Sequence, residues 1–376
     1  MVNPLHNLDL PRLRRRTSIK WRTYPSDVLP MWVAEMDCDL APPVAEAIHG
    51  AIALGDTGYA CGTSYAEALA GFASGRWGWT FETAQTSLVA DVMVGICEVL
   101  KLLTRPGDTI AVSPPVYPPF FMFLTSMGLK PLTAPLDARG RLDPSTLEQA
   151  FTQAKVYLLC NPHNPTGTVH TRQELTDLAA LASEHGVRVL ADEIHAPLTL
   201  PGATFTPWLT VPGAESGFSF MSASKAWNLA GIKSAVAIAG ERAVADLARL
   251  PEEVSHGVSH LGVISHVAAL REGGEWLDGL LSNLDENRTH LANLLKEHLP
   301  AVRHVPAQAT YLAWLDCRDL KLGDDPAEAF LERGRVAVNN GTPFGPGGTG
   351  RVRANIGTSR ELVSEGIRRM ASTVAQ

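Results

Sequence analysis

The chain contains 376 residues, of which 45% are hydrophobic and 19% charged, and this length favours two domains over one. Its 32 basic and 39 acidic residues give a formal net charge of −7, and no basic stripe with interleaved aromatic residues indicates a nucleic-acid partner. No run approaches the roughly 18 apolar residues that a membrane-spanning helix needs, so a membrane protein is not expected.

The first 45 or so residues are rich in proline and poor in regular pattern, and we expect them to pack on a second domain. The basic stretch RRRTSIK near the start is not followed by an apolar segment, so it does not predict an export signal. The five cysteines are scattered and never form a CxxC pair, which is typical of reduced thiols. We therefore expect a cytoplasmic protein.

Short apolar runs then alternate with helical patterns. The stretch 171–186 has a Thr N-cap, a Glu three residues later and a closing Gly, which predicts a helix. Alternation of strand and helix predicts an α/β fold, with a mostly parallel sheet covered by helices on both faces. The runs that predict buried strands are 109–115, 156–160, 187–193, 217–224 and 234–240.

The pattern changes after about residue 270. A long helical stretch, 275–299, is followed by short strand-like pieces at 309–317, 336–341 and 350–357. We predict a large α/β domain over residues 46–275. A smaller α+β domain is predicted from residues 276–376 together with residues 1–45.

Three polar groups lie at the end of, or shortly after, three of the predicted strands: Asn164, Asp192 and Lys225. Turn chemistry alone could explain the NPHNPTG stretch, and a carboxylate that ends a strand is often only solvated. In a parallel sheet, however, the carboxyl ends of strands line one crevice, where ligands bind. A lysine amine can form a Schiff base with an aldehyde such as pyridoxal 5'-phosphate, whose ring nitrogen needs an acidic partner.

The order NPxNPTG, ADEIH, SxSK and a later Lys resembles the fold-type I, aminotransferase-like pyridoxal phosphate enzymes. Within them, the chain is similar to the MalY/PatB group of cystathionine β-lyase-like C–S lyases, from about residue 17 to about 370. The segments that carry this resemblance are LPMWVAEMDCDLAPPVAEAI, GYACGTSYAEALAGFASGRWGW, SPPVYPPF, CNPHNPTGTVHTRQEL, ADEIHAPLTLPG, SASKAWNLAGIKSA and ATYLAWLDC.

The resemblance implies roles around the cofactor. Lys225 matches the Schiff-base lysine, and Asp192 the residue that pairs with the pyridinium nitrogen. Asn164 matches the donor to the phenolic oxygen. Ser222 matches a phosphate-binding serine, and Lys233 a cationic phosphate ligand, with a solvated loop lysine as the alternative for Lys233.

Further matches complete the implied cofactor site. His195 is a candidate neighbour of the phenolic oxygen, and Tyr117 a candidate to stack on the pyridine ring, although both could simply be core residues. The backbone N–H groups of Val92 and Met93, at a predicted helix N-terminus, are expected to bind phosphate. Tyr59 matches a tyrosine that reaches the neighbouring subunit's phosphate, which implies a homodimer with shared active sites.

The resemblance also bears on two arginines and one acid. Arg353 matches the residue that binds the substrate α-carboxylate, whereas we interpret Arg351 as a surface charge. Asp91 stands where the family usually has glycine, and a carboxylate beside a phosphate is unfavourable unless it points away. The histidines in 256–266 could form a metal pair, but we expect no nearby acid to complete a site and therefore no metal.

The resemblance implies β-elimination of S-linked amino acids, which gives a thiol, pyruvate and ammonia. An aminotransferase that uses the same residues is one alternative. A regulatory or binding protein on this scaffold is another. No second arginine is evident for a distal substrate carboxylate, so we expect substrates whose far end is apolar or zwitterionic.

Overall fold

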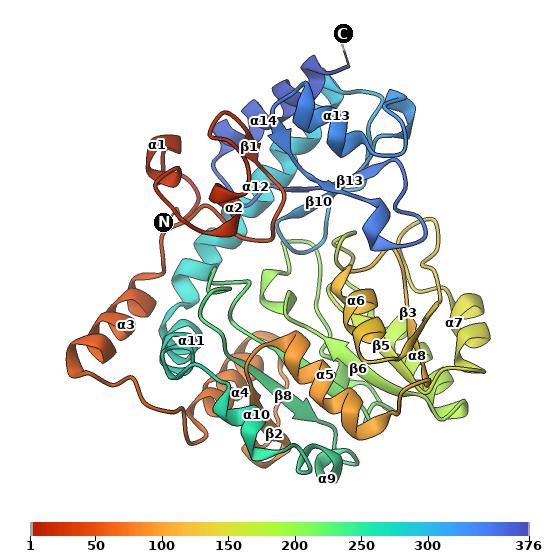
Figure 1. The fold of residues 1–376 in the computed structure, drawn as a ribbon. Coiled ribbons are helices and arrows are strands. Elements are labelled where there is room, and N and C mark those ends of the chain that lie inside the picture. The colour runs from red at the N-terminus through yellow and green to blue at the C-terminus, as the bar shows by residue number, and fades with distance from the viewer. Residues whose placement is uncertain (1–2, 375–376) are drawn as a thin grey trace.

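The computed structural model describes residues 3–374. Figure 1 shows a large part built on a central sheet and a smaller part that contains the C-terminal elements, with the red N-terminal segment lying against that smaller part. The long helix α12 (Gly274–His298) runs from one part into the other.

The central sheet has seven strands in the order β2-β8-β7-β6-β5-β3-β4. Strand β8 is antiparallel to both of its neighbours and all the other pairs are parallel, so the expectation of a mostly parallel sheet is confirmed. The strands are β2 (Thr86–Val89), β3 (Thr109–Val112), β4 (Lys130–Thr133), β5 (Val156–Cys160), β6 (Arg188–Asp192), β7 (Phe218–Met221) and β8 (Ala235–Ala239).

Helices cover both faces of this sheet, and the inner strands β5, β7 and β8 are accordingly buried along their whole length. The odd-numbered residues of β8 pack in the same cluster as Ile96 of α5, whereas the even-numbered ones pack with Leu69 of α4. Gly95 lets α5 lie close to the sheet, since a Cβ there would be 2.8 Å from Cγ2 of Val89. The helices of this part are α4 (Ser64–Trp77), α5 (Val92–Leu103), α6 (Pro119–Ser126), α7 (Pro144–Phe151), α8 (Arg172–Glu184), α9 (Val244–Leu247), α10 (Glu252–His256) and α11 (His260–Glu272).

The helix predicted over 171–186 is α8, and its capping box forms as the sequence indicates. Thr171 and Glu174 exchange side-chain and backbone hydrogen bonds at the N-terminus, and Arg141 pairs with the same glutamate.

The smaller part is built on a four-stranded antiparallel sheet in the order β12-β13-β10-β9. The N-terminal segment joins it through a parallel pairing of β1 with β11, and Leu8 and Leu13 enter its core. The boundaries at residues 45 and 275 stay a prediction. The elements of this part are α1 (Leu10–Leu13), α2 (Ile19–Arg22), β1 (Leu29–Pro30), β9 (Arg303–His304), β10 (Leu312–Asp316), α13 (Pro326–Glu332), β11 (Val336–Ala337), β12 (Asn339–Asn340), β13 (Arg351–Asn355) and α14 (Arg360–Ser372).

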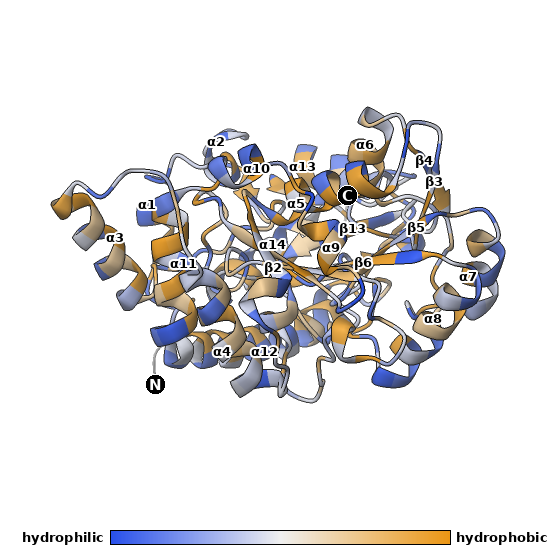
Figure 2. Ribbon diagram, turned by 90° about the horizontal axis from the view of Figure 1, so that it is seen from below, coloured by the Kyte–Doolittle hydropathy of each residue, from blue (hydrophilic) through white to orange (hydrophobic). Residues whose placement is uncertain are grey.

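Helix α3 (Pro42–Leu54) projects from the body of the molecule in both views. Its last turn carries Ile52 and Leu54, which are 57% and 80% exposed, and Figure 2 shows apolar residues along this helix. Within residues 3–374, none of the helices is both long enough and apolar enough to cross a membrane.

Candidate active site

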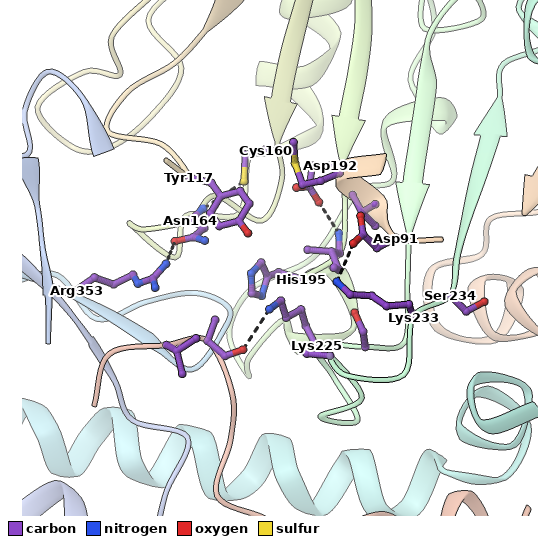
Figure 3. Close-up of a pocket in the computed structure, with 17 residues that line it drawn as sticks. Asp91, Tyr117, Cys160, Asn164, Asp192, His195, Lys225, Lys233, Ser234 and Arg353 are labelled. Atoms are coloured by element: carbon purple, nitrogen blue, oxygen red, sulfur yellow. Dashed lines mark hydrogen bonds and ion pairs between the residues drawn. The ribbon is translucent and has the colours of Figure 1, made fainter. Parts of the chain in front are cut away.

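Three parallel strands end side by side and place their polar residues at one cleft. Cys160 at the end of β5 pairs in register with Asp192 at the end of β6, and Lys225 follows β7 by four residues. The cleft encloses about 900 Å³ including its open mouth. Nine of the eleven predicted site residues line it, as Figure 3 shows for the labelled ones: Val92, Met93, Tyr117, Asn164, Asp192, His195, Lys225, Lys233 and Arg353.

Lys225 lies at the centre of the cleft with few partners. Its Nζ donates to the carbonyl oxygen of Ala34 at 3.2 Å, a contact that is drawn in Figure 3. Burial lowers the pKa of this amine to about 8, and repulsion from Arg353 and Lys233 adds to the effect. A lysine with such a pKa is partly neutral near pH 7–8, which is the form that attacks a carbonyl or accepts a proton.

Asp192 is buried opposite Lys225 and has one backbone donor. The N–H of Ile194 lies 3.1 Å from Oδ1, and the residue is 4% exposed. Burial raises the pKa of this carboxyl group to about 6. A cation placed against its free oxygen would return it to the charged form, so the site suits a protonated ring nitrogen.

Arg353 reaches the cleft from β13 in the smaller part of the molecule. Its guanidinium donates to Oδ1 of Asn164 at 3.0 Å, to Oδ1 of Asn339 at 2.7 Å and to the carbonyl of Trp32 at 3.2 Å, and it lies 5.1 Å from the ring centre of Phe344. All three acceptors are uncharged, although the residue is only 5% exposed. Burial lowers the pKa of Arg353 to about 10. A buried cation whose acceptors are all neutral is ready to bind an anion.

The opposite end of the cleft is formed by the N-terminus of α5. Asp91 is its N-cap: Oδ1 accepts the N–H of Val94 at 2.8 Å. Oδ2 of the same carboxylate accepts from Nζ of Lys233 at 2.7 Å, an ion pair that Figure 3 shows at the cleft wall. Val92 and Met93, the first two residues of the helix, also line the cleft. Free N–H groups of a helix start and a nearby lysine together make an anion site.

Two ring side chains complete the wall. His195 is 3% exposed, and its Nδ1 is buried with no hydrogen-bond partner among residues 3–374. Burial, together with the charges of Lys225 and Arg353, lowers the pKa of this imidazole to about 3, so it is neutral at physiological pH. Burial raises the pKa of the Tyr117 hydroxyl to about 12, which keeps it protonated.

Comparison with known proteins places this site in a family. The model for aminotransferase class I and II matches residues 56–370. The chain belongs to this family. A Mycobacterium leprae protein named "Putative cystathionine beta-lyase" is 53% identical, and the alignment covers 98% of this chain and 97% of that protein. "Cystathionine beta-lyase PatB" of Bacillus subtilis is 32% identical, with 93% of each chain covered.

A solved structure has the same fold over its whole length. It comes from Corynebacterium diphtheriae, is described as a "putative plp-dependent beta-cystathionase", and superposes with a TM-score of 0.94 at 34% identity, covering 99% of each chain. The predicted fold type and the resemblance to the MalY/PatB group are therefore confirmed.

The cleft of this aminotransferase-family chain fits pyridoxal phosphate. A buried amine, a buried carboxyl group with a free oxygen and an unpartnered imidazole nitrogen have the chemistry that an aldehyde, a ring nitrogen and a phenolic oxygen require of their partners. The helix start and Lys233 have the chemistry that binds a phosphate group.

Ser222 and Tyr59 do not line the cleft of their own chain. Ser222 donates to the carbonyl of Ser234 at 2.8 Å and accepts the N–H of Ser224 at 3.1 Å, so its hydroxyl shapes the loop before Lys225. Ser224 and Ser234 lie at the cleft wall instead. Tyr59 is 81% exposed, 5.8 Å from the ring of His256.

One expectation about a charged residue is wrong. Arg351 is not a surface charge: it is half-buried and pairs with Asp316 at 3.4 Å. Acids do lie near two histidines of the 256–266 stretch, since His260 is 3.0 Å from Asp56 and His256 is 3.7 Å from Glu252. These acids point at different histidines, and no group of three or more potential ligands gathers within the described chain.

The sequence did not single out the apolar part of the wall. It comes from Val33 and Ala34 in the N-terminal segment, from Ile194 after β6 and from Ala230 in the loop after Lys225. Ile194 directly follows Asp192 and Glu193, so its place beside the strand end could have indicated that it lines the cleft. The thiol of Cys160 also lines the cleft, and it too could have been found from the strand end.

Glu193 is buried, contrary to the solvated or capping role expected for a lone carboxylate at a strand end. It is 0% exposed and accepts the N–H of Trp208 at 2.7 Å and the hydroxyl of Ser219. Burial raises the pKa of this carboxyl group to about 8. The group is thus mostly protonated in the folded chain at neutral pH.

Replacing Glu193 by glutamine is expected to change how stability depends on pH. Between the unfolded pKa near 4.5 and the folded pKa near 8, the unfolded chain releases a proton that the folded chain keeps, so this residue destabilises the fold as pH rises. The free energy of unfolding of Glu193→Gln, measured in urea, should gain about 1–3 kcal/mol on wild type from pH 5 to pH 8. A difference that does not change with pH would contradict the assignment.

Proposed function

We propose that the chain is a pyridoxal phosphate-dependent carbon–sulfur lyase that removes a thiol from the β-carbon of S-linked amino acids and yields pyruvate and ammonia. One observation carries the proposal: Lys225, Asp192 and Arg353 converge on a single cleft although they come from three distant parts of the chain. The names of the relatives support the same reaction.

When bound, pyridoxal phosphate supplies the aldehyde that takes the amino group and an electron sink for the pair left at Cα. Arg353 binds the α-carboxylate with its planar fork, and Asn164 orients the fork through its amide oxygen. Lys225, with its low pKa, takes the Cα proton in its neutral form. Asp192 keeps a positive ring nitrogen charged through ion pairing.

The residues that line the cleft favour substrates with a thiolate leaving group over substrates with a second, distal carboxylate. The cations that line the cleft are Lys225, Lys233 and Arg353, each of which already has a proposed partner. The remaining wall includes the apolar residues Val33 and Ala34. A second acidic group on the substrate would have no cation to bind and would lose its hydration.

The decisive experiment uses cystathionine as the only substrate, without any keto acid. Pyruvate is followed with lactate dehydrogenase and free thiol with a chromogenic disulfide, and both should appear in equal amounts. Activity that requires an added keto acid would make the protein an aminotransferase. Bound cofactor without turnover of any S-linked amino acid would instead favour a binding role.

We propose that the working form is a homodimer in which each subunit completes the other's site. Helix α3 packs on the body through Val44 and Ala51, whereas its last turn and the loop after it expose Ile52, Leu54 and Tyr59. Isolated chains rarely leave such large apolar side chains exposed together on a projecting element. Tyr59 is too exposed to serve its own cleft and is free to reach a partner's phosphate end.

The five unpaired cysteines support a cytoplasmic location.

Mixing two inactive variants tests the shared site. A Tyr59→Phe subunit combined with a Lys225→Ala subunit should form heterodimers with one intact site, because the native Tyr59 and the native Lys225 meet there. Thiol release should exceed the sum of the separate variants. Heterodimers isolated by two different tags that show no gain would contradict sharing. A mixture of Lys225→Ala with Asp192→Ala, residues proposed to lie in the same site, is the control that should not recover.

A further inference from the structure

The N-terminus of α5 carries an acid where the proposed cofactor phosphate would bind. Asp91 lies at the N-cap, and both of its oxygens are used: Oδ1 accepts the N–H of Val94 at 2.8 Å and Oδ2 accepts from Lys233 at 2.7 Å. Figure 3 shows this pair at the wall of the cleft. The acid and the lysine therefore form one unit at the phosphate end.

The two oxygens of Asp91 have opposite consequences for an anion. The cap bond holds the first turn of α5 in order, which fixes the N–H groups of Val92 and Met93 that also line the cleft. The ion pair occupies the lysine that the phosphate needs, and the carboxylate repels a second anion a few ångströms away. The side chain of Lys233 is 57% exposed, so its flexible stem can turn toward an incoming phosphate.

We propose that Asp91 determines the affinity for the phosphorylated cofactor by competing with its phosphate for Lys233. Binding of the phosphate divides the ammonium of Lys233 between two anions, and the negative charge of Asp91 keeps the affinity below what the helix start and the lysine would give. The capping hydrogen bond of Asp91 does not require its negative charge, so it is separate from this effect. The proposal rests on the proposed cofactor role of the cleft.

Asparagine at position 91 separates the two effects, because its amide oxygen can still cap Val94 while its charge is gone. The dissociation constant for pyridoxal phosphate, measured by dialysing the holoenzyme against graded cofactor concentrations, should fall by roughly tenfold in Asp91→Asn, the scale of one partly screened charge contact. Pyridoxal, which lacks the phosphate, should bind both proteins equally within about twofold, since the effect acts on the phosphate alone.

Two further measurements, the dependence of this gain on salt and on pH, make the test specific. The gain should shrink in high salt, because screening weakens the repulsion that the variant removes. It should grow from pH 5.5 to pH 7.5, as the phosphate takes its second charge at a pKa of about 6. Asp91→Ser, which keeps a capping hydroxyl without charge, should show the same gain and guards against an asparagine variant that folds poorly.

Several outcomes would overturn the proposal. Weaker binding of pyridoxal phosphate by both variants would mean that Asp91 holds Lys233 in place for the phosphate. Equal binding would mean that the charge has no effect, and a similar gain with pyridoxal would place the effect elsewhere in the cleft. If wild type binds no pyridoxal phosphate at all, the cofactor role itself fails, which is a different result from a silent Asp91→Asn.

Discussion

Replacing Lys225 by alanine is expected to abolish thiol release, with kcat lowered on the order of 10⁴-fold or more, because one side chain serves as both the covalent attachment point and the proton acceptor. Its position supports both roles, since the amine is buried in the cleft with Ala34 as its hydrogen-bond partner and a pKa of about 8. The wild-type protein should be yellow, and borohydride should fix the cofactor to a peptide that contains Lys225.

The second lysine of the same loop provides the control. Lys233 points to the phosphate end and pairs with Asp91, so Lys233→Ala should keep the borohydride-stable label on Lys225. A label on Lys233 in the wild-type protein would overturn the assignment. Lys225→Ala that retains cofactor but releases no thiol would show that the cleft itself is intact and that the missing amine is the cause.

The strand-end polar residues could be predicted from the sequence because their positions depend on local pattern. Each ends or follows a largely apolar strand of four or five residues, and parallel pairing then places all of them at one edge. The burial of Glu193 could not be predicted in this way. Its partners, Trp208 and Ser219, come from separate segments that only the fold brings together.

The N-terminal part of the wall depends even more on long-range contacts. Asn228 holds the segment that contains Val33 and Ala34 by bonding both the N–H and the carbonyl of Met36, at 2.8 and 2.9 Å. A buried ion pair of Lys20 with Asp37, at 2.8 Å, fixes the same segment. An irregular stretch held by side chains from distant elements leaves no periodic signal, so only the resemblance to relatives pointed to this segment.

Which serine faces the predicted phosphate site is a third feature that could not be predicted from local sequence pattern. The SASK stretch offers two hydroxyls two residues apart, and the family resemblance favoured Ser222. In the structure its hydroxyl is satisfied by the loop backbone, and it is Ser224 that lines the cleft. Which of two neighbouring serines faces a ligand is decided by loop geometry that spacing alone does not contain.

Replacing Arg353 by alanine is expected to cost about 2–5 kcal/mol in kcat/KM, because it removes one partner of a desolvated charge pair. Its guanidinium is 5% exposed and bound only by neutral acceptors, so the substrate α-carboxylate is its one ionic partner in the proposed complex. Cystathionine and small S-alkyl cysteines present the same α-carboxylate. Their kcat/KM values should therefore fall by the same factor.

Arg351 is the matched control, since it lies two residues away on the same strand. Its side chain pairs with Asp316 outside the cleft, so Arg351→Ala should leave kcat/KM within about twofold, as expected for a charge that does not touch substrate. Arg353→Lys should recover only part of the loss, because an ammonium cannot form the planar two-point contact with a carboxylate. A silent Arg353→Ala beside a damaging Arg351→Ala would move the carboxylate site to the other arginine.

The same substrate panel tests the chemistry of the far end of the cleft. Arg353 is committed to the α-carboxylate, and Lys233 to the phosphate end, so aspartate would place its second carboxylate against the apolar wall at Val33 and Ala34. Wild type should therefore release thiol from S-linked amino acids faster than it transaminates aspartate in the presence of a keto acid. If aspartate transamination is the faster reaction, the cleft contains a cationic contact for the distal carboxylate and the lyase proposal is wrong.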